Sequence, residues 1–128
     1  MFEKVYVVDD DEVSSFLTAV LLETVHFAKQ VESYGSAEEA LNKLLPDNTL
    51  SPPDIIFLDL HMPDLSGWAF LDRLVEKPHF AEKCTVYILT SSVDEEEKAK
   101  SRKYPMVADF LHKPIEEDQL KKILASTT

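Results

Sequence analysis

Short apolar runs alternate with stretches of helical periodicity five times along the chain. The runs fall at residues 4–8, 30–34, 55–58, 85–89 and 107–111. The run at 55–58 contains only apolar residues, which is typical of a parallel strand buried on both faces. The run at 30–34 alternates with polar residues and indicates a strand at the edge of a sheet. We therefore predict five strands.

Between these runs, apolar residues recur at three- and four-residue steps and predict amphipathic helices. The first helix is expected from residue 11 onward, with one apolar face made of Val13, Phe16, Leu17, Val20, Leu21, Val25 and Ala28. A second helix begins at a capping box on Ser36 and ends at Pro46. Further helices are predicted at residues 68–77 and 116–124, with acids in the first turn of the last one.

The helix predicted at residues 94–104 differs from the others. Its positions hold almost no apolar residue except Ala99, and its acids precede its bases in the order that complements a helix macrodipole. A polar helix gains little free energy from packing, so we expect this helix to be weakly anchored and able to shift at small cost.

The alternation of strands and helices predicts an α/β fold. Links of this length allow right-handed crossovers, which produce a doubly wound parallel sheet covered by helices on both faces. The chain has 128 residues, a length that suits a single domain.

The composition of the chain limits the classes of partner that it can bind. The formal net charge of −11 argues against direct binding to nucleic acid, which is itself a polyanion, and favours proteins and cations. Two glycines exclude a glycine-rich nucleotide-binding loop, and Cys84 is the only cysteine, so the chain has no intrachain disulfide. Neither a signal peptide nor an apolar run of the roughly 20 residues that span a bilayer is present. We therefore expect a cytoplasmic protein without membrane insertion.

Four predicted strands end on residues that can take part in chemistry. Asp9 and Asp10 follow the first strand, Asp59 follows the third, Thr90 the fourth and Lys113 the fifth. Ligands bind at the carboxyl ends of the strands in open α/β sheets, so these residues are candidates for a site. An aspartate at the start of a loop also commonly serves only to cap or turn the backbone.

The order of these residues resembles that of response-regulator receiver domains of two-component signalling. The resemblance rests on Val7-Val8-Asp9-Asp10-Asp11, Leu58-Asp59-Leu60-His61-Met62-Pro63 with Gly67, Leu89-Thr90-Ser91, and Lys113-Pro114. It covers essentially the whole chain and implies one receiver domain at residues 1–128. It further implies a flavodoxin-like sheet of five parallel strands in the order 2-1-3-4-5 with five helices.

The acids suggest a metal site. Asp9, Asp10 and Asp59 would meet as like charges in this sheet order, and such a cluster calls for a cation with a preference for hard oxygen ligands. Magnesium, or another divalent cation such as manganese, fits this description. The resemblance implies that the His61 backbone carbonyl joins the three aspartates as a ligand, and that Asp59 is the phosphoacceptor.

The resemblance also implies residues that respond to phosphorylation. Thr90 and Ser91 would bind phosphoryl oxygens, Lys113 would place its ammonium against them, and Phe110 would be the aromatic residue that turns inward. A cis peptide is implied before Pro114. The plainer alternatives are a local hydrogen bond for the threonine, an exposed strand-end lysine and a half-buried phenylalanine that only stabilises the edge strand.

The expected function is to accept a phosphoryl group on Asp59 from a histidine kinase or a histidine-containing phosphotransfer protein. The chain would then present a changed surface to a downstream protein target, catalysing only its own phosphorylation and dephosphorylation. It ends after the last predicted helix, which implies no output domain. A weak homodimer is compatible with the resemblance.

Three alternatives remain. A pseudo-receiver would bind partners without phosphorylation, although all the required residues are present. A haloacid-dehalogenase-like phosphatase needs a second acid two residues after the nucleophile, where this chain has His61. A flavodoxin-like electron carrier shares the architecture but needs a phosphate-binding loop that the sequence lacks.

Overall fold

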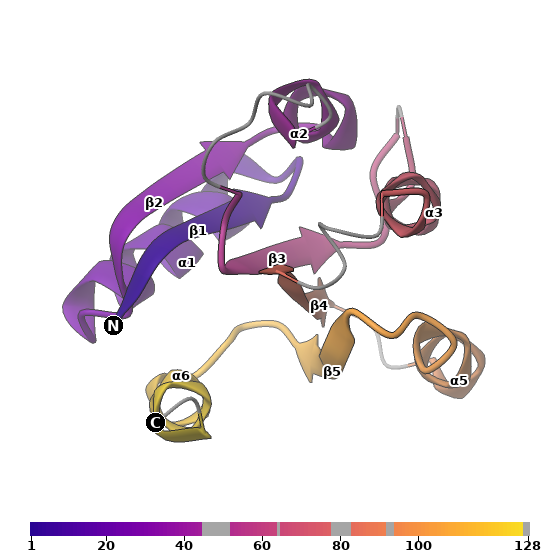
Figure 1. The fold of residues 1–128 in the computed structure, drawn as a ribbon. Helices are drawn as coiled ribbons and strands as arrows, with labels where there is room; N and C mark the ends of the chain where they lie inside the picture. Colours follow the sequence, from indigo (N-terminus) through magenta and orange to yellow (C-terminus); the bar gives the residue numbers. More distant parts are fainter. Residues whose placement is uncertain (45–51, 64, 78–82, 92–93, 127–128) are drawn as a thin grey trace.

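Five parallel strands form one sheet that is covered by helices. The structure is a computed structural model that describes residues 1–44, 52–63, 65–77, 83–91 and 94–126. The strands are β1 (Phe2–Val8), β2 (Ala28–Tyr34), β3 (Ile55–Asp59), β4 (Thr85–Thr90) and β5 (Val107–His112). The helices are α1 (Glu12–Thr24), α2 (Ala37–Leu44), α3 (Gly67–Val75), α5 (Glu95–Ser101) and α6 (Glu117–Ser126). The strand order β2-β1-β3-β4-β5 confirms the predicted doubly wound, flavodoxin-like α/β fold (Figure 1).

The helices cover both faces of the sheet. In Figure 1, α1 and α6 lie on one face, and α2, α3 and α5 lie on the other. Side chains along a strand alternate between these faces. Val5 and Val7 pack in the core cluster that contains residues of α1 and α6, whereas Tyr6 and Val8 pack in the cluster that contains residues of α2 and α3. All of β3 is buried and β2 lies at an edge, as the apolar runs predict.

Helix α1 ends earlier than its apolar periodicity predicts. The pattern continues to residue 28, but α1 stops at Thr24 and Ala28 already belongs to β2. The reason lies at His26, whose φ of 53° is in the left-handed region that ends helices. The amide of the next residue, Phe27, bonds to the carbonyl of Leu22, and the Phe27 side chain turns into the core.

Only the later part of the predicted apolar face of α1 packs against the core, where Leu21, Val25 and Ala28 are partly buried. Val13, Phe16, Leu17 and Val20 are 42–68% exposed. The face toward the sheet carries Ser15, Thr18 and Leu22 instead. Small polar side chains let the helix lie close to the sheet, and the larger apolar residues are left on the outer surface. Helical periodicity identifies a stripe but does not say what the stripe packs against.

Polar side chains cap several helices, and the cap at Ser36 is the one predicted from the sequence. Asp11 caps α1 by accepting from two backbone amides, Ser36 Oγ accepts from the amide of Glu39, and Ser66 caps α3. The predicted helix end at Pro46 lies outside the described residues. Helix α5 buries only Ser101 among its residues, which confirms that it lacks an apolar anchor.

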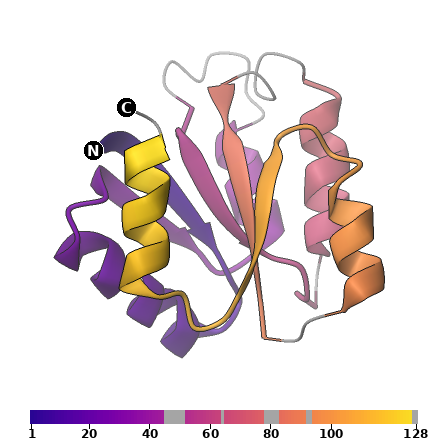
Figure 2. The ribbon, with the colours of Figure 1, turned by 90° about the horizontal axis from the view of Figure 1, so that it is seen from below.

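Figure 2 shows the N-terminus and the end of α6 at the edge of the sheet where the strands begin, opposite to the strand ends that carry the candidate residues. None of the helices in the described ranges is long and apolar enough to cross a membrane. Cys84 is buried and free, and burial raises the pKa of its thiol to about 12.

Candidate functional site

The carboxyl ends of β1 and β3 bring three aspartates together. Asp9 and Asp10 follow β1, and Asp59 ends β3, which pairs with β1 in parallel register. One carboxylate oxygen from each residue lies within 4.8 Å of those from the other two. Asp9 and Asp59 are buried, whereas Asp10 is exposed at the rim. The structure thus gathers the acids that the sequence singled out.

Backbone amides orient the two buried carboxylates. Asp9 Oδ1 accepts a hydrogen bond of 3.0 Å from the Asp11 amide. Asp59 Oδ1 likewise accepts one of 3.0 Å from the His61 amide. Each acid therefore uses one oxygen to fix the turn that follows its strand.

The other oxygen of each buried acid faces Lys113. The Lys113 Nζ atom lies 2.8 Å from Asp9 Oδ2 and 3.2 Å from Asp59 Oδ2, and the lysine side chain is only 16% exposed. Its backbone amide donates to the carbonyl of Thr90 at 2.7 Å, and the peptide bond to Pro114 is cis, as the resemblance implies. This lysine is therefore part of the cluster, which excludes the alternative of an exposed strand-end residue.

Burial and charge shift the pKa values of these three groups in different directions. Burial raises the pKa of Asp9, but hydrogen bonds from Lys113 and the Asp11 amide outweigh burial and hold it below its usual value. Burial is also the largest influence on Asp59, and with the nearby charge of Asp9 it keeps the pKa of Asp59 raised despite the His61 amide and the lysine. Burial lowers the pKa of Lys113, but the two carboxylates outweigh it and the pKa is raised. A bound cation would favour the ionised form of Asp59.

The donor atoms of the cluster fit a hard divalent cation. Its three members offer only carboxylate oxygens, which magnesium prefers over nitrogen or sulfur ligands. The exposed position of Asp10 leaves the cluster open to solvent on one side, which suits an ion that keeps several of its waters. The residues present therefore fit magnesium, and the resemblance adds the His61 carbonyl as a further oxygen ligand.

The predicted response residues lie beyond the acidic cluster. Thr90 is fully buried at the end of β4, and Ser91 directly after it is exposed. Phe110 on β5 is partly buried against the core cluster beneath α2 and α3. This packing is also what a purely stabilising phenylalanine would show, so the switching role of Phe110 stays a prediction.

Two further residues shape the site: Gly67 belongs to the motif that carries the resemblance, whereas Glu97 was not found from the sequence. A Cβ atom on Gly67 would lie 2.7 Å from the Asp59 carbonyl oxygen and 2.8 Å from Leu60 Cα, so only glycine lets α3 approach the end of β3 this closely. The second residue is Glu97 of α5, whose Oε1 lies 3.2 Å from His61 Nε2. No sequence pattern links these two positions.

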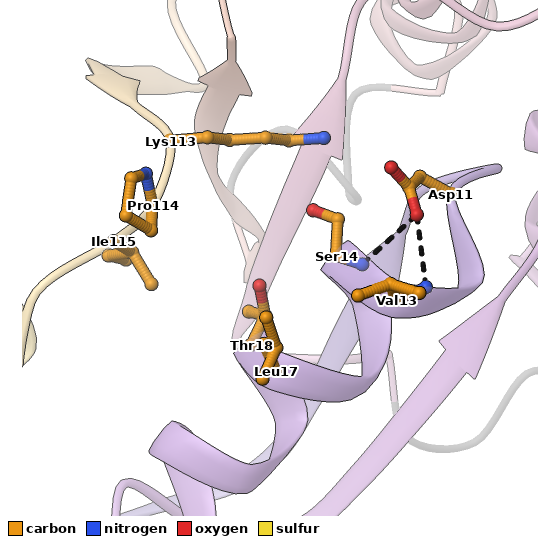
Figure 3. A pocket seen from close by; sticks show the side chains of 8 residues that line it. All are labelled: Asp11, Val13, Ser14, Leu17, Thr18, Lys113, Pro114 and Ile115. Carbon is orange, nitrogen blue, oxygen red and sulfur yellow. Dashed lines mark hydrogen bonds between the residues drawn. The ribbon is translucent and has the colours of Figure 1, made fainter.

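A groove of about 310 Å³ opens beside the cluster (Figure 3). One wall is the start of α1, with Val13, Leu17 and Thr18, and the other is the segment 113–115. Figure 3 shows the Lys113 side chain extending across the mouth of the groove toward the start of α1. The groove therefore joins the exposed apolar stripe of α1 to the acidic cluster.

The fold and the cluster together define a parallel α/β protein with an acidic cluster at the carboxyl edge of its sheet whose oxygen atoms fit a cation. The profile of the family described as Response regulator receiver domain matches residues 5–125, so the chain belongs to this family of two-component signalling domains. Receiver domains accept phosphoryl groups, bind magnesium in an acidic pocket and interact with histidine kinases or phosphotransfer proteins.

Known proteins agree with this assignment. The chain is 32% identical over 123 residues to "Hybrid signal transduction histidine kinase L" of Dictyostelium discoideum, covering 94% of this chain and 7% of that protein. It is 30% identical over 120 residues to "Signal transduction histidine-protein kinase BarA" of Escherichia coli, again over 94% of this chain but 12% of the kinase. The chain thus spans a small part of these relatives. A two-component response regulator from Cytophaga hutchinsonii has 27% identity and a TM-score of 0.89, over 98% of this chain and 96% of the other.

Proposed function

We propose that Asp59 is the phosphoacceptor of a single receiver domain that takes its phosphoryl group from a phosphohistidine. The observation that carries this proposal is the position of Lys113. Its ammonium contacts one oxygen of Asp59 and one of Asp9, residues 54 and 104 positions away in sequence. An acid held beside a second acid and a fixed cationic group is an arrangement suited to a phosphoryl group, which carries negative charge on three oxygens.

The proposed reaction is a direct transfer. A carboxylate oxygen of Asp59 attacks the phosphorus atom while the P–N bond to the donor imidazole breaks, and the imidazole leaves with that electron pair. The product is an acyl phosphate on Asp59. Catalysis consists mainly of positioning and charge neutralisation. The His61 amide fixes one carboxylate oxygen, and Lys113 is placed to contact the phosphoryl oxygens as they arrive.

Asp9, Asp10, Asp59 and the His61 carbonyl would hold magnesium, which supplies charge neutralisation between the carboxylates and the phosphoryl oxygens when bound. Asp9 keeps this role available because the pKa of its carboxyl group is lowered, which favours the ionised form. Its second hydrogen bond, to the Asp11 amide, holds the carboxylate in place without using the oxygen that faces the pocket.

Thr90, Ser91 and Phe110 are proposed to convert the phosphoryl group into a changed surface. Thr90 and Ser91 would donate to phosphoryl oxygens, and Phe110 would repack as the segment after β4 moves. Phe110 lines a pocket together with Lys98 and Arg102 of the α5 region, so repacking of its ring would be felt by α5. The weak apolar packing of α5 supports this readout, because a helix that buries only Ser101 can move at small cost.

The exposed stripe of α1 is the proposed contact surface for a helical, histidine-bearing donor. Val13, Phe16, Leu17 and Val20 follow the i, i+3, i+4, i+7 spacing by which one helix recognises another. The groove between this stripe and residues 113–115 leads to Lys113, so a donor seated there reaches the cluster. The net charge of −11 favours a donor surface with basic residues around its apolar contacts.

The main test is incubation with acetyl phosphate and magnesium, followed by intact mass measurement. A gain of one phosphoryl group is expected, and it should be absent in Asp59→Asn and in the presence of EDTA. No gain in the wild-type protein would favour the pseudo-receiver. Continuous release of phosphate from unrelated small esters would favour the phosphatase.

The docking surface is tested with two donors. Phe16→Ser is expected to slow transfer from a phosphorylated histidine phosphotransfer protein about tenfold, the effect of losing roughly 1.4 kcal/mol at an interface. Phosphorylation by acetyl phosphate should not change, because that donor is too small to touch α1. Val75→Ser is the matched control, since this valine is also exposed but lies on α3. Equal effects of the two variants would contradict docking on α1.

A further inference from the structure

One side chain of α5 reaches back to the loop that follows the phosphoacceptor. Glu97 Oε1 lies 3.2 Å from His61 Nε2, across 36 residues of sequence. The Glu97 side chain is only 18% exposed, whereas its neighbours Glu95 and Glu96 are exposed. Glu97 therefore points inward, toward the mouth of the site, although it lies in the first turn of a helix with little apolar packing.

His61 is one hydrogen bond away from the phosphoacceptor carboxylate. Its amide donates to Asp59 Oδ1 at 3.0 Å, and its carbonyl is the proposed backbone ligand of the cation. The imidazole of the same residue is the group that meets Glu97. A single residue thus joins α5 to the carboxylate that reacts, and any displacement of its side chain acts on a backbone that already orients Asp59.

Directed contacts also fix the other end of α5. Lys100 Nζ lies 4.6 Å from the centre of the Trp68 ring, which stacks on Tyr104 at 5.8 Å between centroids. The Tyr104 hydroxyl donates to Asp72 Oδ1 at 2.7 Å. These contacts tie α5 and the residues after it to α3. The helix is therefore held between α3 at one end and the phosphoacceptor loop at the other, and Glu97 makes the contact to that loop.

We propose that Glu97 is a positioning residue that acts through His61 to hold the phosphoacceptor loop in the conformation that binds the cation. In this role it couples α5 to the acidic cluster in both directions. A protein that binds α5 and displaces Glu97 weakens cation binding, and cation binding favours the α5 position seen here, because coupling between two binding sites is reciprocal. The proposal uses the cation ligands of the proposed function but does not require that Asp59 be phosphorylated.

The test is a magnesium titration of the unphosphorylated protein, followed by NMR through the His61 amide signal. Glu97→Ala is expected to raise the half-saturating magnesium concentration about threefold, the effect of one partly exposed polar contact. Glu97→Gln keeps an oxygen that accepts from the imidazole and should remain close to wild type. Glu95→Ala removes the same charge from the same helical turn and should have no effect, because Glu95 is exposed.

The pattern among these variants separates positioning from charge. Glu97→Gln and Glu97→Ala lose the same charge, so equal weakening of magnesium binding by both would show a purely electrostatic effect and overturn the proposal. His61→Ala removes the contact from its other side. It should weaken magnesium binding to a similar extent, and adding Glu97→Ala to it should produce little further change. Fully additive losses in this double variant would also contradict the coupling.

The phosphorylation readout distinguishes this inference from the proposed function. At saturating magnesium, the rate of phosphorylation of Glu97→Ala by acetyl phosphate should lie within about twofold of the wild-type rate, because the loop is then held by the cation. A wild-type protein that binds magnesium but is never phosphorylated would refute the proposed function and leave the titration intact. If the half-saturating magnesium concentration of every Glu97 variant equals that of the wild-type protein, only the inference about Glu97 is refuted.

Discussion

Replacement of Lys113 by methionine tests the central ion cluster most directly. The variant keeps the length of the side chain but removes the ammonium that contacts Asp9 and Asp59. The Asp9 side chain is only 2% exposed, so its charge would lie buried with only the Asp11 amide and the Ser14 side chain left as hydrogen-bond donors. Removing one partner of a buried ion pair typically lowers folding stability by about 3–5 kcal/mol.

The expected loss for Lys113→Met is about 3 kcal/mol in EDTA, at the low end of that range because the lysine is still 16% exposed. A domain of 128 residues has an unfolding entropy of roughly 0.27 kcal/mol/K, so the melting temperature should fall by roughly 11 °C. Lys121→Met is the matched control. Its partner Glu117 is one helical turn away and both side chains are more than half exposed, so the loss should be about 0.5 kcal/mol or less.

Two further measurements define this prediction. Magnesium should stabilise Lys113→Met more than the wild-type protein, because the cation then neutralises the carboxylates that have lost their lysine. The difference between wild type and variant should also shrink in acid. Since the pKa of Asp9 is lowered in the folded state, its stabilising charge is present above its unfolded pKa of 3.8 and is lost as the pH falls through the folded value. Equal melting temperatures for the Lys113 and Lys121 variants would refute the reasoning.

Two other substitutions should change stability in opposite directions. Asp59→Asn is expected to stabilise the protein in EDTA at pH 7 by about 0.5–2 kcal/mol. The pKa of Asp59 is raised in the folded state, so its ionised form destabilises the fold. Thermal melts should show that the gain becomes smaller as the pH falls through the folded and then the unfolded pKa of Asp59. Gly67→Ala should destabilise the protein by about 1–3 kcal/mol, because the new Cβ would overlap backbone atoms of Asp59 and Leu60. The control is Gly35→Ala, whose Cβ would have no atom within 4 Å; it should be neutral or slightly stabilising. Urea titrations measure both effects.

Most of the fold could be predicted because buried strands correspond to short runs of apolar residues in the sequence. An all-apolar run such as residues 55–58 has few alternatives to a central strand, and the structure buries it completely. Helix boundaries were harder to predict. The apolar spacing of α1 continues through Val25 and Ala28, yet His26 adopts a left-handed conformation and ends the helix. The apolar spacing of α1 also does not show which part of the helix is buried, because close approach to the sheet favours Ser15 and Thr18 over larger apolar residues.

The candidate site could be predicted only in part. The aspartates and Lys113 were found because each follows a strand, and parallel strands present these ends at one edge of the sheet. Glu97 could not be found this way. Its contact with His61 depends on how α5 sits against a loop from another part of the chain, and a run of glutamates in a polar helix gives no indication of which one turns inward.

The alternation of side chains across the sheet explains how one cluster could serve both input and output. Val7 and Phe57 pack on the α1 and α6 side, so Asp9 and Asp59, two residues further along each strand, continue on that side beside the groove. The Thr90 side chain points to the opposite face of the sheet, because Leu89 before it packs on the α1 and α6 side. Asp59, the proposed phosphoacceptor, therefore faces the proposed donor surface, while Thr90 faces the side of the sheet that α5 covers. In the proposed mechanism, a signal from Asp59 to α5 therefore passes from one face of the sheet to the other.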